Sequence, residues 1–254
     1  MPSLEQLVIS FTLVGFRVSG LMLMAPFFGS ASLPPRIKAA FTVLLVWLLA
    51  PNLHLSLSGT STLGWTQVGL SELAIGMLLG LSVQFVFEAS QFAGQILGVQ
   101  LGFSLVHVLD PQSQADTPVL GLLQQTIVLL LFLALDIPHH LLRALVQSFS
   151  FLPPGTFVLT GAAVGELVQM AGRLFITGLQ LAAPALTATM LADLVLGFIG
   201  KMSPQLPVLF VGLSVKSVLG LAVLLAVVWT WPQFFQNAFS AALQEGERLL
   251  RISH

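Results

Sequence analysis

The sequence predicts an all-α fold of hydrophobic helices, typical of a multi-pass membrane protein. Of its 254 residues, 56% are hydrophobic and 7% are charged, whereas about a quarter of the residues in a soluble domain are charged. Several apolar runs approach the roughly 20 residues that a helix needs to cross a bilayer. No segment alternates polar and apolar residues between turns, as a half-buried strand does.

The apolar runs of the first half differ in length. The first covers residues 7–28, and a shorter one at 39–50 follows. A connection rich in Ser, Thr and Gly at 52–66 predicts a loop. The third run, at 68–105, is too long for one ordinary crossing. It therefore either breaks near Ser90 or forms one long helix.

Polar and proline-rich breaks also separate the segments of the second half. The breaks are a polar segment at 106–117 and a Pro-Pro-Gly turn at 153–155. Between and after them we expect helices at 118–135 and 139–151, an over-long run at 167–199, an apolar run at 206–231 and an amphipathic tail to residue 254.

The sequence predicts one subunit over residues 1–254, because no linker or charge block divides the chain. Residues 68–120 and 162–209 show a weak internal similarity that includes Leu-Gly-Phe, Pro-Gln and Pro-Val-Leu. Transporters often contain such halves. A composition rich in Leu, Gly and Pro could produce the same matches, so both explanations stay open.

Glycines recur every four residues in the third run. They are Gly76 and Gly80, followed by Gly94, Gly98 and Gly102. This spacing keeps small residues on one face of a helix, where a neighbouring backbone can approach closely. Helix packing accounts for the glycines, but it accounts less well for the Gln and Glu residues of the same run.

Six charged residues lie inside apolar runs, where each would cost about 2.5–3.5 kcal/mol at the centre of a bilayer. They are Arg17, Glu72, Glu88, Arg173, Asp193 and Lys216. We expect them to face a partner or water. For any one of them, a structural ion pair is favoured over a role in transport.

Several classes of function are excluded or disfavoured. A net charge of −1 argues against nucleic-acid binding, and the absence of cysteine excludes disulfides and thiolate metal sites. No Walker loop, GxSxG, GxGxxG or HExxH motif occurs. His139 and His140 are adjacent, so on a helix they diverge by about 100°. We therefore expect no catalytic residue, cofactor or metal.

Blocks of sequence in the same order along nearly the whole chain resemble the FliR family of flagellar export-gate proteins, whose injectisome counterparts are the SctT/SpaR proteins. The matching blocks are 17–22 (RVSGLM), 25–29 (APFFG), 33–38 (LPPRIK), 71–76 (SELAIG), 91–94 (QFAG), Asp110-Pro111, 118–120 (PVL), 193–201, 203–205 (SPQ) and Lys216.

This resemblance implies a place in a larger assembly. Members of the family form an export gate with FliP and FliQ, joined by FlhB, in the inner membrane and the flagellar basal body. Their helical hairpins pack into a helical assembly around a channel that unfolded flagellar proteins cross. The buried charges and over-long runs would then contact other subunits instead of lipid.

The resemblance also implies a channel plug formed by one loop. The matching segment consists of Val106, His107, Val108, Leu109, Asp110, Pro111, Gln112, Ser113, Gln114, Ala115, Asp116 and Thr117. A solvated hairpin connection explains the same composition. Two other functions also stay open, namely an injectisome export-gate homologue and, from the internal similarity and the charges, a secondary transporter for a small solute.

Overall fold

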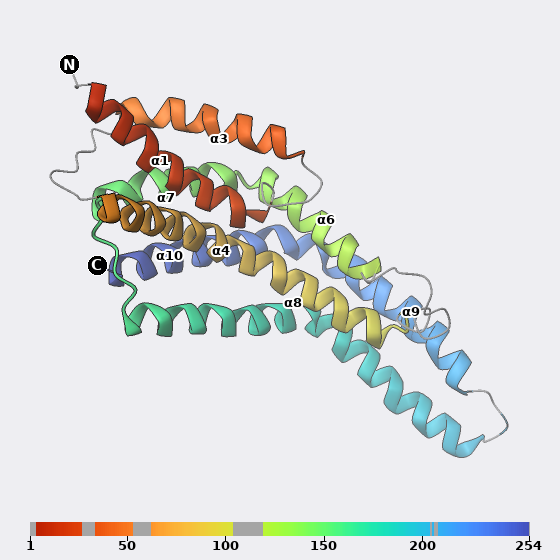
Figure 1. The fold of residues 1–254 in the computed structure, drawn as a ribbon. Coiled ribbons are helices and arrows are strands. Elements are labelled where there is room, and N and C mark those ends of the chain that lie inside the picture. The colour runs from red at the N-terminus through yellow and green to blue at the C-terminus, as the bar shows by residue number, and fades with distance from the viewer. Residues whose placement is uncertain are drawn as a thin grey trace. The chain divides into compact units, whose positions relative to one another are not determined.

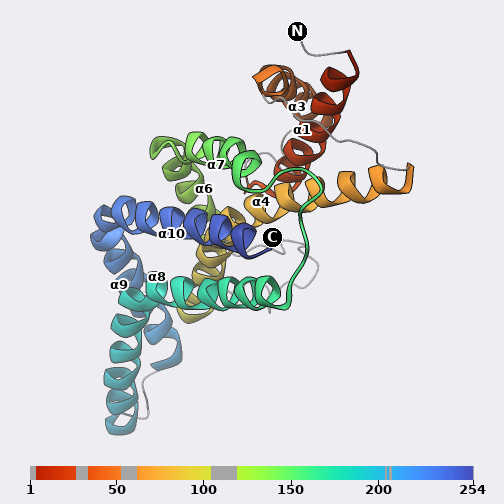
Figure 2. The same ribbon diagram turned by 90° about the vertical axis from the view of Figure 1, so that its left-hand side faces the viewer.

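The computed structural model describes residues 4–26, 34–52, 62–103, 119–203, 205 and 208–253, and within these ranges the chain is helical without strands. Figures 1 and 2 show the helices from two directions. In chain order they are α1 (Leu4–Met24), α3 (Pro35–Leu49), the 3-10 helix η1 (Ala50–Asn52), α4 (Thr62–Gln100), α6 (Val119–Ala134), α7 (Ile137–Phe151), α8 (Gly161–Met202), α9 (Val208–Val227), the 3-10 helix η2 (Val228–Thr230) and α10 (Trp231–Ile252). The all-α prediction is confirmed.

The over-long third run forms one helix. Helix α4 continues for 39 residues through Ser90 without a break, so the alternative of a break at that residue is wrong. At about 1.5 Å per residue it is about 59 Å long, roughly twice the hydrocarbon thickness of a bilayer. Helix α8 has 42 residues and contains Pro184.

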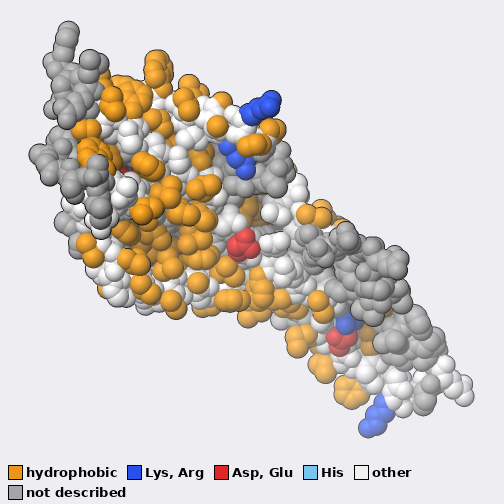
Figure 3. Space-filling model, in the orientation of Figure 1, with side chains coloured by type: hydrophobic (Ala, Val, Ile, Leu, Met, Phe, Trp, Pro, Cys, Tyr) orange, Lys and Arg blue, Asp and Glu red, His pale blue; other side chains and the backbone are white. Residues whose placement is uncertain are grey.

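Among the described residues, four segments are long and apolar enough to cross a membrane, or five if α6 and α7 together form one broken span. The four are Leu7–Met24, Gly64–Gln100, Gly161–Met202 and Val211–Ile252. Large apolar side chains are exposed along them, such as Phe198 and Leu225, each at 71%, and hydrophobic side chains cover much of the surface in Figure 3. These features identify a multi-pass membrane protein.

Two compact units divide the chain. The first unit comprises Met1–Phe85, Asp136–Gly172 and Phe239–His254, and the second comprises Val86–Leu135 and Arg173–Ala238. The single-subunit assignment and the internal similarity stay predictions.

Glycines bring α1 and α4 together in the first unit. A Cβ atom at Gly76 would overlap the carbonyl oxygen of Arg17, and one at Gly20 would overlap that of Leu73. At Gly80 it would lie 2.9 Å from the Cβ atom of Met24. The two backbones therefore approach as closely as small residues allow.

Other segments of the first unit lie beside this pair. Helix α3 packs against α1, although Leu45 is its one buried residue among those described. The backbone N–H of Val158 donates to the carbonyl of Ser253 at 3.0 Å, which ties the segment before α8 to the end of α10.

In the second unit, α4 packs against α6 on one side and α8 on another. A Cβ atom at Gly94 would lie 2.5 Å from the Cα atom of Gly121 on α6. A Cβ atom at Gly178 on α8 would lie 2.7 Å from the carbonyl oxygen of Ala89. Edge-to-face aromatic pairs accompany both contacts, Phe87 with Phe132 at 5.5 Å and Phe92 with Phe175 at 5.3 Å.

We expect Gly76→Ala to destabilise the protein by about 1–3 kcal/mol, because the added methyl group forces α1 and α4 apart. The measurement is the thermal unfolding midpoint of the purified chain in detergent. Gly165→Ala is the matched control, since nothing lies within 4 Å of a Cβ atom there and replacing a helical glycine usually stabilises. Equal midpoints for the two variants would contradict the close approach.

Candidate functional site

A fully buried ion pair lies at the centre of the first unit. The Nε atom of Arg17 on α1 is 2.6 Å from Oε2 of Glu72 on α4, and both side chains have no exposed surface. The sequence predicted that these two charges need partners, and the structure brings them together across 55 positions.

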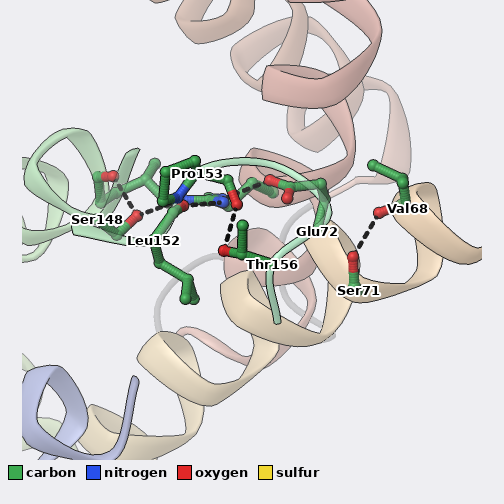
Figure 4. Close-up of polar contacts among 9 residues, drawn as sticks. Val68, Ser71, Glu72, Ser148, Leu152, Pro153 and Thr156 are labelled. Atoms are coloured by element: carbon green, nitrogen blue, oxygen red, sulfur yellow. Dashed lines mark hydrogen bonds and ion pairs between the residues drawn. The ribbon is translucent and has the colours of Figure 1, made fainter. Parts of the chain in front are cut away.

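The rest of the guanidinium contacts the C-terminal end of α7. Nη1 of Arg17 donates to Oγ of Ser148 at 2.8 Å, and Nη2 donates to the carbonyl oxygen of Leu152 at 3.1 Å. The ring of Phe149 lies 3.9 Å from Cζ of Arg17. Figure 4 shows this chain of contacts from Ser148 across to Glu72.

Local structure explains why these groups meet. Gly76, one turn after Glu72, allows the α1 backbone at Arg17 to come close. The last carbonyls of a helix lack intrahelical partners, and Leu152 directly follows α7. A guanidinium with several planar donors can serve a carboxylate, a hydroxyl and a carbonyl at once.

A turn after α7 runs beside this network. The hydroxyl of Thr156 donates to the carbonyl of Pro153 at 2.7 Å, and Figure 4 shows this bond next to the ion pair. Further along, the hydroxyl of Thr160 donates to the carbonyl of Ile252 at 3.3 Å. The first bond closes the turn itself, and the second ties the segment before α8 to the end of α10 within the first unit.

A second ion pair lies in the second unit and is more exposed. Nζ of Lys216 on α9 is 2.9 Å from Oδ1 of Asp193 on α8, with 17% and 46% of the two side chains exposed. The side-chain amide of Gln100 also donates to Oδ2 of Asp193 at 3.1 Å. The cluster joins α4, α8 and α9, while its carboxylate stays accessible.

Glu88 and Arg173 lie on α4 and α8 of the second unit. Glu88 is half-buried and Arg173 is exposed, and each makes an interaction with its surroundings.

The five predicted packing glycines do not share one face. Gly76 and Gly80 lie against α1, and Gly94 lies against α6, while Gly98 is buried. Gly102 lies beyond the end of α4 with φ of 84°, next to Leu213. Including Gly102 in a helical ladder was wrong, because the helix ends at Gln100 in a turn whose positive φ suits glycine.

The segment Val106–Thr117 lies outside the described residues, so its assignment as a plug stays a prediction. The described chain stops at Phe103 and resumes at Val119 on α6.

Within the described ranges, no three His, Asp or Glu side chains gather as metal ligands would. Nδ1 of His139 lies 3.6 Å from Oδ1 of Asp136, with both side chains 75% exposed. The first unit also has a pocket of about 370 Å³ whose lining, which includes Met77, Phe157 and Leu249, is apolar. Its walls offer no group for acid–base or nucleophilic chemistry.

Three contacts of the buried network could not be foreseen from the sequence. Ser148, Phe149 and Leu152 are residue types that occur at the end of any ordinary amphipathic helix. The one local signal is the position of Leu152 beside a proline pair, which predicts a helix end with free carbonyls.

Comparison with known proteins gives a consistent result along the chain. Residues 8–242 match the family described as "Bacterial export proteins, family 1". The FliR flagellar biosynthetic protein of Escherichia coli K12 is 30% identical over 224 residues, which cover 88% of this chain and 86% of that protein. The protein of the same name from Bacillus subtilis 168 is 28% identical over 255 residues, which cover 99% of this chain and 98% of that protein. The one from Caulobacter vibrioides is 27% identical over 226 residues, which cover 86% of this chain and 90% of that protein.

We expect Arg17→Leu to destabilise the protein by about 3–5 kcal/mol, because it leaves the carboxylate of Glu72 buried without its partner. Arg17→Lys should recover only part of this loss, since one ammonium cannot reproduce the forked donor set. The double variant R17L/E72L should recover more, because no buried charge remains. The measurement is thermal unfolding of the purified chain in detergent.

Asp193→Asn is the matched control for this series. Its carboxylate is 46% exposed, so removing the charge should cost at most about 1 kcal/mol. An Arg17→Leu variant as stable as Asp193→Asn would show that the buried pair does not hold the first unit together.

Proposed function

The chain belongs to family 1 of the bacterial export proteins, and we propose on this basis that it is a subunit of the flagellar protein export gate. In this proposal it forms, with FliP and FliQ, the channel through which unfolded flagellar proteins cross the inner membrane. FlhB joins the same assembly in the basal body. The observation that carries the proposal is the family match over residues 8–242.

Two structural features support a role in an assembly. Helices α4 and α8, with 39 and 42 residues, are longer than a single crossing requires. Apolar side chains also remain exposed on described helices of both units, for example Trp47 at 66% and Trp229 at 86%. Large exposed apolar surfaces mark sites of interaction with other proteins or with a membrane, and in an assembly neighbouring subunits would cover them.

The flagellar names of the relatives favour this role over the two alternatives from the sequence. Relatives that cover most of the chain are called flagellar biosynthetic proteins, which favours the flagellar branch over an injectisome. A family of export proteins also favours a polypeptide over a small solute as the transported species. We propose that the chain itself catalyses no reaction and contributes channel wall.

Deleting the gene in its source bacterium should abolish secretion of flagellin and swimming, and the intact gene should restore both. A tagged copy should co-purify with FliP and FliQ after detergent extraction. Swimming deletion cells, or a tagged chain that purifies alone while FliP and FliQ assemble without it, would overturn the proposal. Unchanged uptake of small solutes in the deletion strain separates the gate from a transporter.

Within this function, we propose that Val106–Thr117 acts as the channel plug. Its Asp-Pro pair and short polar residues disfavour continuation of the helix. An irregular backbone at membrane depth is tolerated where protein or a water-filled cavity satisfies it. A segment that blocks and then opens a pore must also be held by modest contacts.

Replacing residues 106–117 with a short Gly/Ser connector should increase leakage of small ions across the inner membrane of cells that make the whole gate. The leakage is measured by the collapse of the membrane potential, and strains without FliP serve as the control. A gate that assembles normally and stays as tight as the wild type would refute the plug.

A further inference from the structure

The apolar pocket of the first unit lies between five segments of the chain. Its volume is about 370 Å³. Its walls come from α1, α4, the segment between α7 and α8, α8 and α10, represented in this order by Met24, Leu78, Phe157, Ala163 and Leu249. In Figures 1 and 2 the segment between α7 and α8 passes beside the end of α10. Parts of the first unit that are far apart in sequence therefore build one pocket.

The spacing of the lining residues explains why the walls are continuous. On α4 they are residues 74, 77, 78 and 81, a spacing that places them on one face of the helix. On α8, Ala163 and Leu167 lie one turn apart. The alanines at 74 and 163 end at Cβ, so they leave room for a ligand between the helices.

The pocket leads from an exposed rim to a buried floor. At the rim, Leu159 is 61% exposed and Val164 is 44% exposed. At the floor, Ala163 and Leu249 are 1% and 2% exposed. Figure 3 shows hydrophobic side chains over much of the surface around α4 and the start of α8. An apolar molecule in contact with this surface can therefore enter at the rim and reach the floor.

The chemistry of the walls disfavours water as the occupant. A water molecule in a protein cavity needs two to four polar partners, and apolar cavities stay dry. The walls of this pocket are apolar side chains. Unfilled apolar space lowers the stability of a protein in proportion to its volume, because the lining atoms lose their contacts. The pocket is therefore suited to an apolar ligand.

Size and polarity favour an acyl chain over a segment of another protein. A cavity of about 150 Å³ holds one benzene ring, so a pocket of about 370 Å³ is larger than one aromatic side chain needs. A longer peptide segment would bring backbone N–H and C=O groups into the pocket, where the apolar walls offer them no hydrogen bonds. An acyl chain is long and flexible, and its polar ester end can stay outside.

We propose that this pocket binds one acyl chain of a membrane phospholipid, whose headgroup stays outside the rim at Leu159 and Val164. The acyl chain would contact α4, α8 and α10 at once and so stabilise the first unit. Lipid tails are as apolar as the pocket, so the bilayer supplies the ligand at high concentration and close packing supplies the preference for the site. Binding of this kind requires a membrane but no export activity, so it goes beyond the proposed function.

Photo-labelling in living cells tests the contact directly. Cells that make the protein with its natural partners incorporate a photoactivatable fatty acid into their phospholipids. After illumination the protein is purified, and the labelled positions are mapped by mass spectrometry. We expect adducts at Met77 and Leu249, because both line the pocket. Leu250 is the matched control, since it is as buried as Leu249 at 0% exposure but does not line the pocket, so it should carry no label.

Filling the pocket should displace the lipid. In Ala163→Leu the added carbon atoms occupy part of the pocket, and labelling of Leu249 should fall roughly tenfold, as the usual cost of overpacking implies. Ala74→Leu fills the pocket from α4 and should act in the same way. Ala162→Leu is the matched control, because Ala162 is exposed and does not line the pocket, so labelling should not change.

Lipid-dependent stability supplies a second measurement. Phosphatidylglycerol added in mixed micelles should raise the thermal unfolding midpoint of the purified wild-type protein by about 5 °C or more at saturation. The increase should be much smaller in Ala163→Leu. Glycerophosphoglycerol, the same headgroup without acyl chains, should have no effect, which separates binding of the acyl chain from binding of the headgroup.

Three results would overturn the lipid site. The first is a wild-type protein without label at Met77 and Leu249. The second is labelling or lipid-dependent stability that both filling variants leave unchanged. The third is a photoreactive amino acid at Met77 that links to another protein and to no lipid, because a neighbouring subunit would then fill the pocket.

Discussion

The first unit depends on the burial of one charged pair. Taking Arg17 and Glu72 out of water costs several kcal/mol per charge, and their attraction offsets this only with close geometry and further hydrogen bonds. The structure supplies close geometry through the 2.6 Å contact, and the guanidinium gains further hydrogen bonds to Ser148 and Leu152. Helices α1, α4 and α7 therefore have to meet at one point, because any other arrangement leaves a buried charge without its partner.

Glycine at Gly20 and Gly76 makes this meeting sterically feasible. A side chain at either position would overlap the facing backbone, so α1 and α4 could not come close enough for a short ion pair. In a membrane, helices gain little from the hydrophobic effect when they associate, and close packing and polar contacts decide which faces meet. The glycines and the ion pair thus specify the same helix face by two independent means.

The sequence predicted the helices well and their partners poorly. Apolar periodicity and length are local properties, so most runs were found, and the charges at Arg17 and Glu72 were recognised as needing partners. Pairing across 55 positions depends on tertiary packing, which one sequence does not reveal. Ser148 carried no distinguishing signal, and the proline pair after Leu152 predicted only that a helix ends there. Gly102 continued the four-residue spacing although α4 had already ended at Gln100.

The polar residues of the two units follow different rules because their surroundings differ. Arg17 and Glu72 are fully buried, so each needs a fixed partner within the chain. Asp193 stays half-exposed beside Lys216, where solvent screening makes the pair worth little for stability. An accessible carboxylate among exposed apolar side chains is costly in lipid. Its retention is better explained by a neighbouring subunit or by water.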